Sequence, residues 1–464
     1  MTTTPPRFDT RQRLILLVLL GAGFMLSVDF SILNVALPEA GAGVGMELTA
    51  LPWITSAFAL PAAGFTLLFG RLGDLFGRRR LFLTAMAVLT AASLLGGLAS
   101  TPEMLLTARA LQGLATAMTI PAALSLLTTT FTEGATRDRV LGLNGALLAG
   151  GFTVGALAGG TLVGLLSWRA AFLINIPVTV AILVLTPILI GESRRTGRVR
   201  LDLPGAVAVT GGLLAVVYAI IEKSAPAAVA GLLLLAAFWV IELRSPAPLA
   251  PLRILRRPTV KWGNLGGLVV FSMGTAMIFL MTLYLQKILG FSPLVTGLVF
   301  GVPGLAAVAA GPMAGRLIGR HGSRRVLAAG IAVQGLATLP LVFLGTDRVG
   351  LAVAVPALFI AFFGHVTAIV AYTVTGTSGL ADGEQGLATG LTSMTQNVAI
   401  TVGIPILAAI AATRTDELGG IHLALSVDVA ATLTGAALVW FGLRPRGDRR
   451  SAVQADGDTV AVGA

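Results

Sequence analysis

The stretch GRLGDLFGRRR (residues 70–80) returns as GRLIGRHGSRR (residues 315–325), and this repetition decides the fold that the sequence predicts. One copy follows the second apolar stretch of the chain, and the other copy follows the tenth. Each copy has two glycines at GxxxG spacing, such as Gly73 and Gly77, which lets helix backbones approach closely in a membrane. The repetition therefore predicts a six-helix unit used twice, with two helices inserted between the copies.

Apolar stretches long enough to cross a bilayer occupy most of the chain. A hydrocarbon core of about 30 Å requires about 20 helical residues. Because lipid offers no hydrogen-bond partner, each span has to close its backbone bonds internally as a helix. The sequence predicts an all-α membrane protein with fourteen spans: 14–36, 50–70, 81–100, 104–128, 139–165, 171–190, 203–221, 227–243, 263–285, 294–314, 326–345, 349–376, 387–411 and 421–443.

The cations between the spans predict the orientation. Most of the 32 Lys and Arg residues fall in the N-terminal segment, in every second loop and in the C-terminal segment. Arg109 lies within a span, and the remaining loops contain only Arg169, Lys223, Lys287, Arg348 and Arg414. Because loops rich in Lys and Arg stay on the cytoplasmic side, both termini are predicted to be cytoplasmic.

These boundaries divide the chain into six segments. They are a cytoplasmic N-terminus (1–13), a six-helix bundle (14–190), two inserted helices (203–243), a cytoplasmic linker (244–262), a second bundle (263–443) and a polar tail expected to be disordered (444–464).

Composition excludes several functions. The net charge of +11 is spread over short loops without interleaved aromatic residues, so we expect contacts with lipid headgroups and no nucleic-acid partner. With no cysteine, only three histidines and no paired carboxylates within the spans, the sequence predicts neither an enzyme nor a metal or cofactor site.

A charged pair within the spans is the first candidate for function. Asp29, in LSVDFSILNVALP (26–38), lies about 10 Å below the outer end of its span, and Arg109 lies at a similar depth. A charge in hydrocarbon costs about 3 kcal/mol unless it faces a cavity or a partner. The pair therefore predicts either a fixed brace between helices or, as we favour, a site for a coupling proton or for substrate.

Two glycine-rich elements could move. In the loop 70–80, Asp74 can pair with Arg78 one helical turn away or face a helix N-terminus, and a contact made in one conformation only would act as a latch. A plain cytoplasmic loop is the alternative. The residues assigned to switching are Gly70, Gly73, Asp74, Gly77, Arg78 and Arg79, together with Gly151, Gly155 and Gly159, which form a smooth stripe that ordinary packing would also explain.

These motifs together resemble the major facilitator superfamily, specifically its fourteen-span drug:proton antiporters. The similarity covers nearly the whole chain: LSVDFSILNVALP in the first span, GRLGDLFGRRR after the second, RALQG (109–113) in the fourth and GLNGALLAGGFTVGALAGG (142–160) in the fifth. WRAAFLINIP (168–177) and YLQKILGFSPLVTGLVFGVPG (284–304) extend it. The chain departs from the family pattern at Ala156, where proline is usual, and at Gly319, which stands where the first loop has Asp74.

The resemblance implies a monomeric transporter of the bacterial inner membrane that exports a small amphipathic compound in exchange for protons. Spans 1, 2, 4, 5, 9, 10, 12 and 13 should line a central cavity. Candidate substrate contacts on them are Phe24, Phe30, Asn34, Gln112, Met118, Gln286, Phe362, His365, Gln396 and Asn397. The alternative for His365 is a packed, hydrogen-bonded residue, and Asp428, on a peripheral span, is expected to face lipid headgroups.

Other functions stay open on sequence alone. The cargo could be a broad range of drugs or antibiotics, or one secondary metabolite made by the cell. An uptake permease for a small organic solute would share the architecture, but it would require more charged or amide groups facing the cavity than this chain offers.

Overall fold

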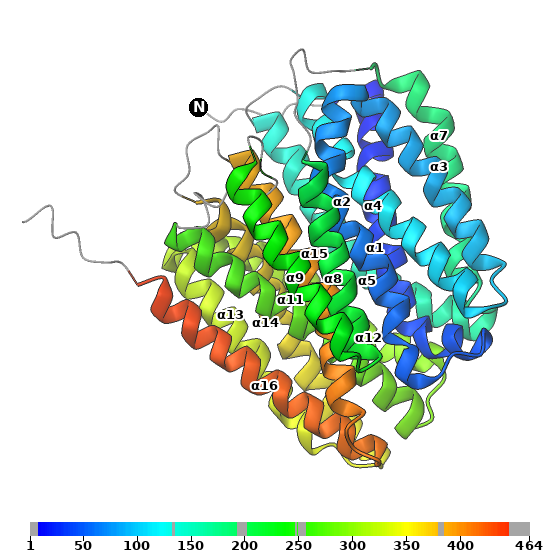
Figure 1. Ribbon diagram of the computed structural model, residues 1–464, viewed down its shortest axis with the longest axis vertical. Coiled ribbons are helices and arrows are strands. Elements are labelled where there is room, and N and C mark those ends of the chain that lie inside the picture. The colour runs from blue at the N-terminus through cyan, green and yellow to red at the C-terminus, as the bar shows by residue number, and fades with distance from the viewer. Residues whose placement is uncertain are drawn as a thin grey trace, which may run out of the picture.

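The computed structural model describes residues 8–131, 135–192, 202–245, 248, 257–378 and 385–444. The regular structure of these residues is helical throughout, as predicted (Figure 1). The first helix group consists of α1 (Thr10–Gly43), α2 (Pro52–Phe76), α3 (Arg78–Gly97), α4 (Pro102–Thr130), α5 (Ala135–Leu165), α6 (Ala170–Leu173) and α7 (Asn175–Leu189). Two helices follow, α8 (Leu203–Ile221) and α9 (Ala225–Arg244).

The second helix group consists of α11 (Pro258–Leu283), α12 (Pro293–His321), α13 (Ser323–Thr338), α14 (Leu351–Thr377), α15 (Gln385–Ala411) and α16 (Glu417–Gly442). A π-helical turn, η2 (Tyr284–Ile288), extends α11, and a 3₁₀ turn, η3 (Leu339–Phe343), extends α13. Shorter 3₁₀ turns, η1 (Leu48–Ala50) and η4 (Arg348–Gly350), precede α2 and α14.

Every predicted span corresponds to a helix. Thirteen segments of the described part of the chain are long and apolar enough to cross a membrane. The remaining predicted span, 139–165, lies within α5, a 31-residue helix in which several side chains fall outside the described part. The predicted span 171–190 is divided at Ile174 into α6 and α7. The chain is therefore a multi-pass membrane protein.

The repeated sequence forms the same turn in both groups. Gly77 ends α2 with φ 109°, and Gly322 ends α12 with φ 80°. These values favour glycine, because a side chain would meet its own backbone there. The helix boundary in each copy therefore depends on the glycine that aligns with its counterpart. The predicted close helix contact at Gly315 and Gly319 is not observed among the described residues, since an added Cβ would meet none of their atoms within 4 Å.

The two helix groups meet toward the end of the bundle where α5 ends and α12 begins. A Cβ at Gly160 would lie 2.8 Å from Gly297 Cα, so the two backbones touch. At the same end, Gln286 Nε2 donates a hydrogen bond to Val35 O (3.0 Å). Toward the other end of α12, an added Cβ at Gly311, Gly315 or Gly319 would meet no described atom within 4 Å. This contact end is opposite to the predicted cytoplasmic side.

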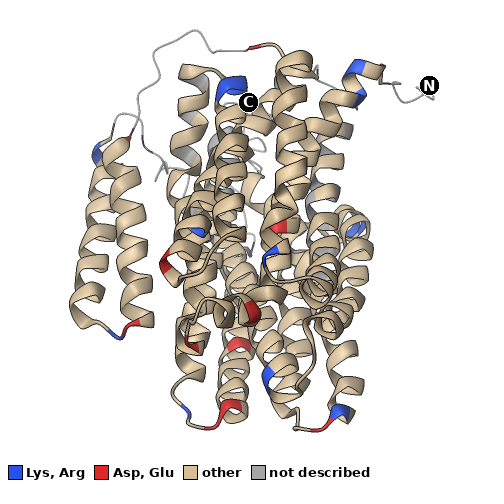
Figure 2. Ribbon diagram, turned by 90° about the vertical axis from the view of Figure 1, so that its right-hand side faces the viewer, with Lys and Arg blue, Asp and Glu red and all other residues tan. Residues whose placement is uncertain are grey.

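The inserted helices stand at the edge of the bundle, where Figure 2 shows them as a separate hairpin with charged residues at both ends. Of the two, α8 packs against α2 of the first group and α15 of the second. A Cβ at Gly64 of α2 would lie 1.7 Å from Thr210 Oγ1, so the glycine admits this side chain of α8. Helix α8 therefore bridges the two groups along one face.

Candidate functional site

Asp29 and Arg109 meet inside the first helix group. Arg109 Nη1 donates to Asp29 Oδ2 at 3.3 Å, and Gln112 Nε2 donates to Asp29 Oδ1 at 3.0 Å. Asn175 of α7 also donates to Asp29 Oδ1, and its amide reaches Ser93 Oγ of α3 at 3.1 Å. We call these five residues the Asp29 network. Four helices contribute to it, and each of its residues is at most 1% exposed.

The RALQG motif explains how Arg109 is positioned. A Cβ at Gly113 would lie 2.0 Å from Phe58 O, so α2 approaches α4 closely only because this residue is glycine. The same approach brings Ile54 O to 3.2 Å from Arg109 Nε, and the Phe58 ring to 4.4 Å from the guanidinium carbon. The guanidinium is thus shared between a carboxylate, a carbonyl and an aromatic face.

The contacts of the Asp29 network satisfy the carboxyl group almost completely. A cation and two amide donors surround Asp29. In the described part of the chain, Asn175 Oδ1 is buried without a hydrogen-bond partner. Ion pairs removed from water are tolerable only when such additional donors complete them. The carboxyl group of Asp29 is thus held by one charged donor on α4 and by neutral amide donors on α4 and α7.

The glycine stripe of α5 packs against α1 on the segment that holds Asp29. Cβ atoms at Gly151, Gly155 and Gly159 would lie 2.7, 2.6 and 2.9 Å from Phe24 O, Val28 O and Ile32 O. The smooth face predicted for α5 is therefore the surface that packs against α1. The side chain of Ala156 lies outside the described part of the structure.

The loop 70–80 is held by the end of α7. Glu192 Oε1 accepts from the backbone N–H of Arg79 (3.1 Å), and Arg79 Nη1 donates to Ile190 O (3.1 Å). Arg80 Nε lies 3.7 Å from Glu192 Oε2, although this arginine is 66% exposed. Glu192 thus places a negative charge at the start of α3, which the helix dipole favours. The side chain of Asp74, the residue predicted to act as a latch, lies outside the described part.

The predicted substrate contacts are not gathered in one place. Gln112 belongs to the Asp29 network, Asn34 Nδ2 donates to Phe30 O in its own helix (3.0 Å), and Gln286 joins the two helix groups. His365 packs between helices, with Nδ1 3.2 Å from Gln334 Oε1 and Gly274 against its ring, as the packed alternative predicted. Met118 and Phe362 are buried, whereas Phe24, Phe30, Gln396 and Asn397 are half-buried.

One position was predicted wrongly. Asp428 does not face headgroups, because its side of α16 packs inside the second helix group and the residue is 0% exposed. Sequence reasoning also missed Ser93, Asn175 and Glu192. Each is a single polar residue on or beside a helix assigned to the periphery, and neither its type nor its spacing distinguishes it.

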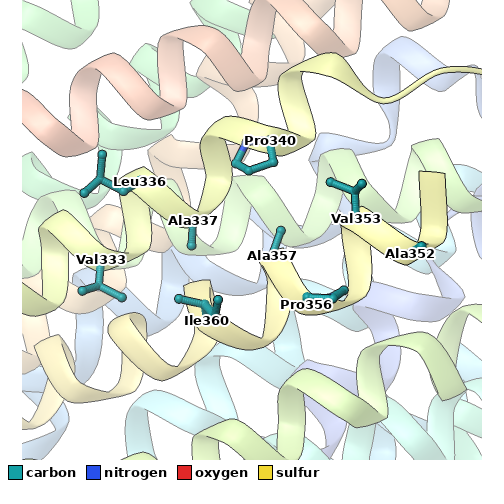
Figure 3. Close-up of a pocket in the computed structure, with 9 residues that line it drawn as sticks. All are labelled: Val333, Leu336, Ala337, Pro340, Ala352, Val353, Pro356, Ala357 and Ile360. Atoms are coloured by element: carbon teal, nitrogen blue, oxygen red, sulfur yellow. The ribbon is translucent and has the colours of Figure 1, made fainter.

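An apolar groove lies away from the Asp29 network, on the second helix group. It measures about 490 Å³ and is formed by α13, the following turn η3 and α14 (Figure 3). Its lining residues are Val333, Leu336, Ala337, Pro340, Ala352, Val353, Pro356, Ala357 and Ile360. None of the predicted substrate contacts is among them.

A membrane-spanning bundle made of two similar helix groups, with an ion pair buried in one of them, defines a secondary transporter rather than an enzyme. Comparison with known families agrees with this class. The family model described as Major Facilitator Superfamily matches residues 19–404, and the chain belongs to that superfamily.

Curated relatives with similar sequences are named as exporters or resistance proteins. The cephamycin export protein CmcT of Amycolatopsis lactamdurans is 37% identical over 85% of this chain and 84% of the relative. The puromycin resistance protein pur8 of Streptomyces alboniger is 35% identical over 93% and 91%. The multidrug resistance protein Stp of Mycobacterium tuberculosis is 31% identical over 87% and 76%.

Solved structures support the fold. A peptide transporter POT in complex with sulfate matches with a TM-score of 0.71 at 15% identity, over 94% of this chain and 95% of that chain. The human organic anion transporter MFSD10 matches with a TM-score of 0.63 at 16% identity, over 93% and 100%.

Proposed function

We propose that this protein exports an antibiotic or a similar amphipathic compound from the bacterial cytoplasm, and that proton entry through Asp29 drives the export. The names of the relatives support the class of cargo. The buried pair of Asp29 and Arg109 is the observation that carries the proposal, because charged residues within the hydrocarbon region are costly and mark proton or substrate pathways.

The coupling step that we propose is an exchange of partners at Asp29. When Arg109 is in place, the carboxyl is ionised and held by three donors. If movement of α4 relative to α1 withdraws Arg109, the isolated carboxylate binds a proton, because a charge without a partner is unstable in this environment. Return of Arg109 then releases the proton. Binding and release on opposite sides of the membrane would couple proton entry to export.

We propose that the two helix groups tilt relative to each other, with 14–190 and 263–443 as the moving units. Their contacts at the predicted outer end, and the open end of α12 at the other, support an inward-facing state for the conformation described. In this scheme Asp74, the glycines of the loop 70–80 and the Arg78–Arg79 pair control switching rather than binding. The α5 stripe of Gly151, Gly155 and Gly159 allows α5 to shift along α1.

A dedicated exporter of one metabolite is the second candidate. It is favoured by relatives named for single compounds, such as the cephamycin export protein and the probable actinorhodin transporter of Streptomyces coelicolor. A panel of lipophilic cations and neutral antibiotics, tested for dissipation of an imposed pH gradient in inverted vesicles, distinguishes the two candidates. A broad exporter responds to many of these compounds, whereas a dedicated one responds to a single chemical class.

Asp29→Asn tests the coupling. The amide keeps the size of the side chain but cannot bind and release a proton, so we expect gradient-driven export from proteoliposomes to be lost. Exchange of labelled for unlabelled substrate across the same membrane, which requires no net proton movement, should persist. Glu103→Gln, the same change at an exposed acid in the first turn of α4, is the matched control and should transport normally. Undiminished gradient-driven export by Asp29→Asn would refute coupling through Asp29.

A further inference from the structure

Asp428 is a second buried acid, and the scheme above does not use it. It lies on α16, which packs against α13, α11, α15 and η3. Its side chain is 0% exposed, and Thr432, one turn further along, packs against Gly335 of α13, where an added Cβ would lie 3.1 Å from Thr432 Cγ2. The carboxyl is therefore enclosed within the second helix group, as Asp29 is within the first.

The partners of the two acids differ. Asp29 has an arginine and two amides, so both of its oxygens accept hydrogen bonds. Among the described residues, Asp428 Oδ1 accepts only from Thr432 Oγ1, at 3.3 Å, and Asp428 Oδ2 is buried without a hydrogen-bond partner. The amide of Gln334 on α13 does not supply the missing donor, because its Nε2 is itself without a partner.

None of the described charged or titratable side chains near α16 pairs with the Asp428 carboxyl, because each either has another partner or is exposed. On α13, Arg324 Nη2 donates to Trp440 O, twelve residues and about 18 Å along α16 from Asp428, and Arg325 is exposed. On α16 itself, His422 Nε2 lies 2.8 Å from Leu344 O, while Glu417 is exposed in the first turn.

The other elements packed against α16 offer no cation to Asp428 either, as far as they are described. Lys261 lies over the Trp262 ring near the start of α11, and Lys287 of η2 is exposed. Tyr284 OH donates to Gly345 O. The residues of α15 and η3 include no Lys, Arg or His.

The energy difference between the two forms of the carboxyl is decisive. A neutral acid with one unsatisfied oxygen carries only the cost of a buried polar group without a partner. An ionised carboxylate without a cation costs several times more, because its hydration is lost without compensation. We propose that Asp428 is a proton-binding site of the second helix group and that its carboxyl holds a proton in this conformation, in which Asp29 is ionised.

Infrared spectroscopy of the full-length protein in lipid nanodiscs at neutral pH tests this proposal. A protonated carboxyl has a carbonyl stretching band distinct from that of an amide or a carboxylate, and the band shifts in D₂O. We expect this band in the wild type and in Asp29→Asn, and its loss in Asp428→Asn. If Asp428→Asn does not yield folded protein, Asp428→Glu replaces it, and the band should then shift in frequency.

An unchanged band in Asp428→Asn, or a wild type with no protonated carboxyl, would show that Asp428 is ionised and would overturn the proposal. The measurement requires neither substrate nor a gradient. A failure of coupling through Asp29 therefore leaves this result intact, and a failure here leaves the proposed export intact.

Discussion

At the scale of single residues, Gly113 and Arg109 form one device. The glycine removes the atoms that would keep α2 away, and the arginine then reaches a carbonyl of α2 as well as Asp29. Their separation of four residues in RALQG places both on one face of α4. The RALQG motif therefore supplies both the close packing of α2 on α4, through Gly113, and the charge that pairs with Asp29, through Arg109.

Gly113→Ala should damage the Asp29 network without touching any of its members. The new methyl group would lie 2.0 Å from Phe58 O, and backbone cannot move aside as a side chain can. We expect a loss of about 1–3 kcal/mol from overpacking, measured as a lower Tm in detergent. Gly150→Ala is the matched control, since its Cβ would meet nothing within 4 Å, and its Tm should not fall. Because alanine favours a helix more than glycine does, helix propensity alone would raise the Tm of both variants, and equal losses would show that the contact with Phe58 O does not set the effect.

How far the site could be predicted also depends on single residues. Asp29 and Arg109 were found because charges are rare within apolar spans, and the prediction that they lie close together is confirmed by their contact. Ser93 and Asn175 could not be found, because a serine or an asparagine in a span often bonds only to its own helix. Asp428 was misplaced because the span pattern does not show which face of α16 is buried.

At the scale of elements, the two repeated loops form the same turn, at Gly77 and at Gly322, but the residues around the two turns differ. Gly77 is enclosed, with Glu192 Cδ only 2.7 Å from an added Cβ, whereas nothing lies within 4 Å of one at Gly322. The first loop is therefore tied to α7, and the equivalent position in the second loop is open. The repetition predicted the turn, but only the structure reveals this asymmetry.

Substitution of Gly77 and Gly322 should separate the cost of backbone strain at the turn from the cost of displacing Glu192. Gly322→Ala should lower stability by about 1–3 kcal/mol through backbone strain alone. Gly77→Ala should lower it further, because the methyl group also displaces Glu192 from the start of α3. Chemical denaturation followed by tryptophan fluorescence measures both. Gly319→Ala, one turn earlier in α12 and in open space, should be neutral, and a loss as large as that of Gly322→Ala would argue against the strain.

At the scale of the whole molecule, nearly all of the fold could be predicted from sequence, because span length, charge distribution and one repeated loop are sufficient. What could not be predicted is the conformation. The closing contacts between α5 and α12 involve glycines and apolar side chains. Neither sequence segment on its own shows which residues of the other it contacts. They bring together residues more than a hundred positions apart.

Cysteine cross-linking tests this arrangement, and the natural chain contains no cysteine to interfere. A Cβ at Gly164 would lie 2.8 Å from Leu294 Cβ, so Gly164→Cys with Leu294→Cys should form a disulfide on oxidation. Transport should then stop and should recover on reduction, because the outer end cannot open. Gly160→Cys with Gly319→Cys, on the same two helices, is the control and should not cross-link, since Gly319 is about 33 Å along α12 from Gly297, the neighbour of Gly160. Full transport by the cross-linked pair would rule out opening at this end.

The placement of α8 has a consequence for the route of an apolar cargo, if the proposed export is correct. This helix touches α2 of one group and α15 of the other, and Thr210 is fitted into α2 at Gly64. In the tilting that we propose, α8 would have to follow one of the groups and slide along the other. In the structure, α8 covers the boundary between α2 and α15 on this face. A compound dissolved in the bilayer would then have to enter the protein between helices other than α2 and α15 on this face.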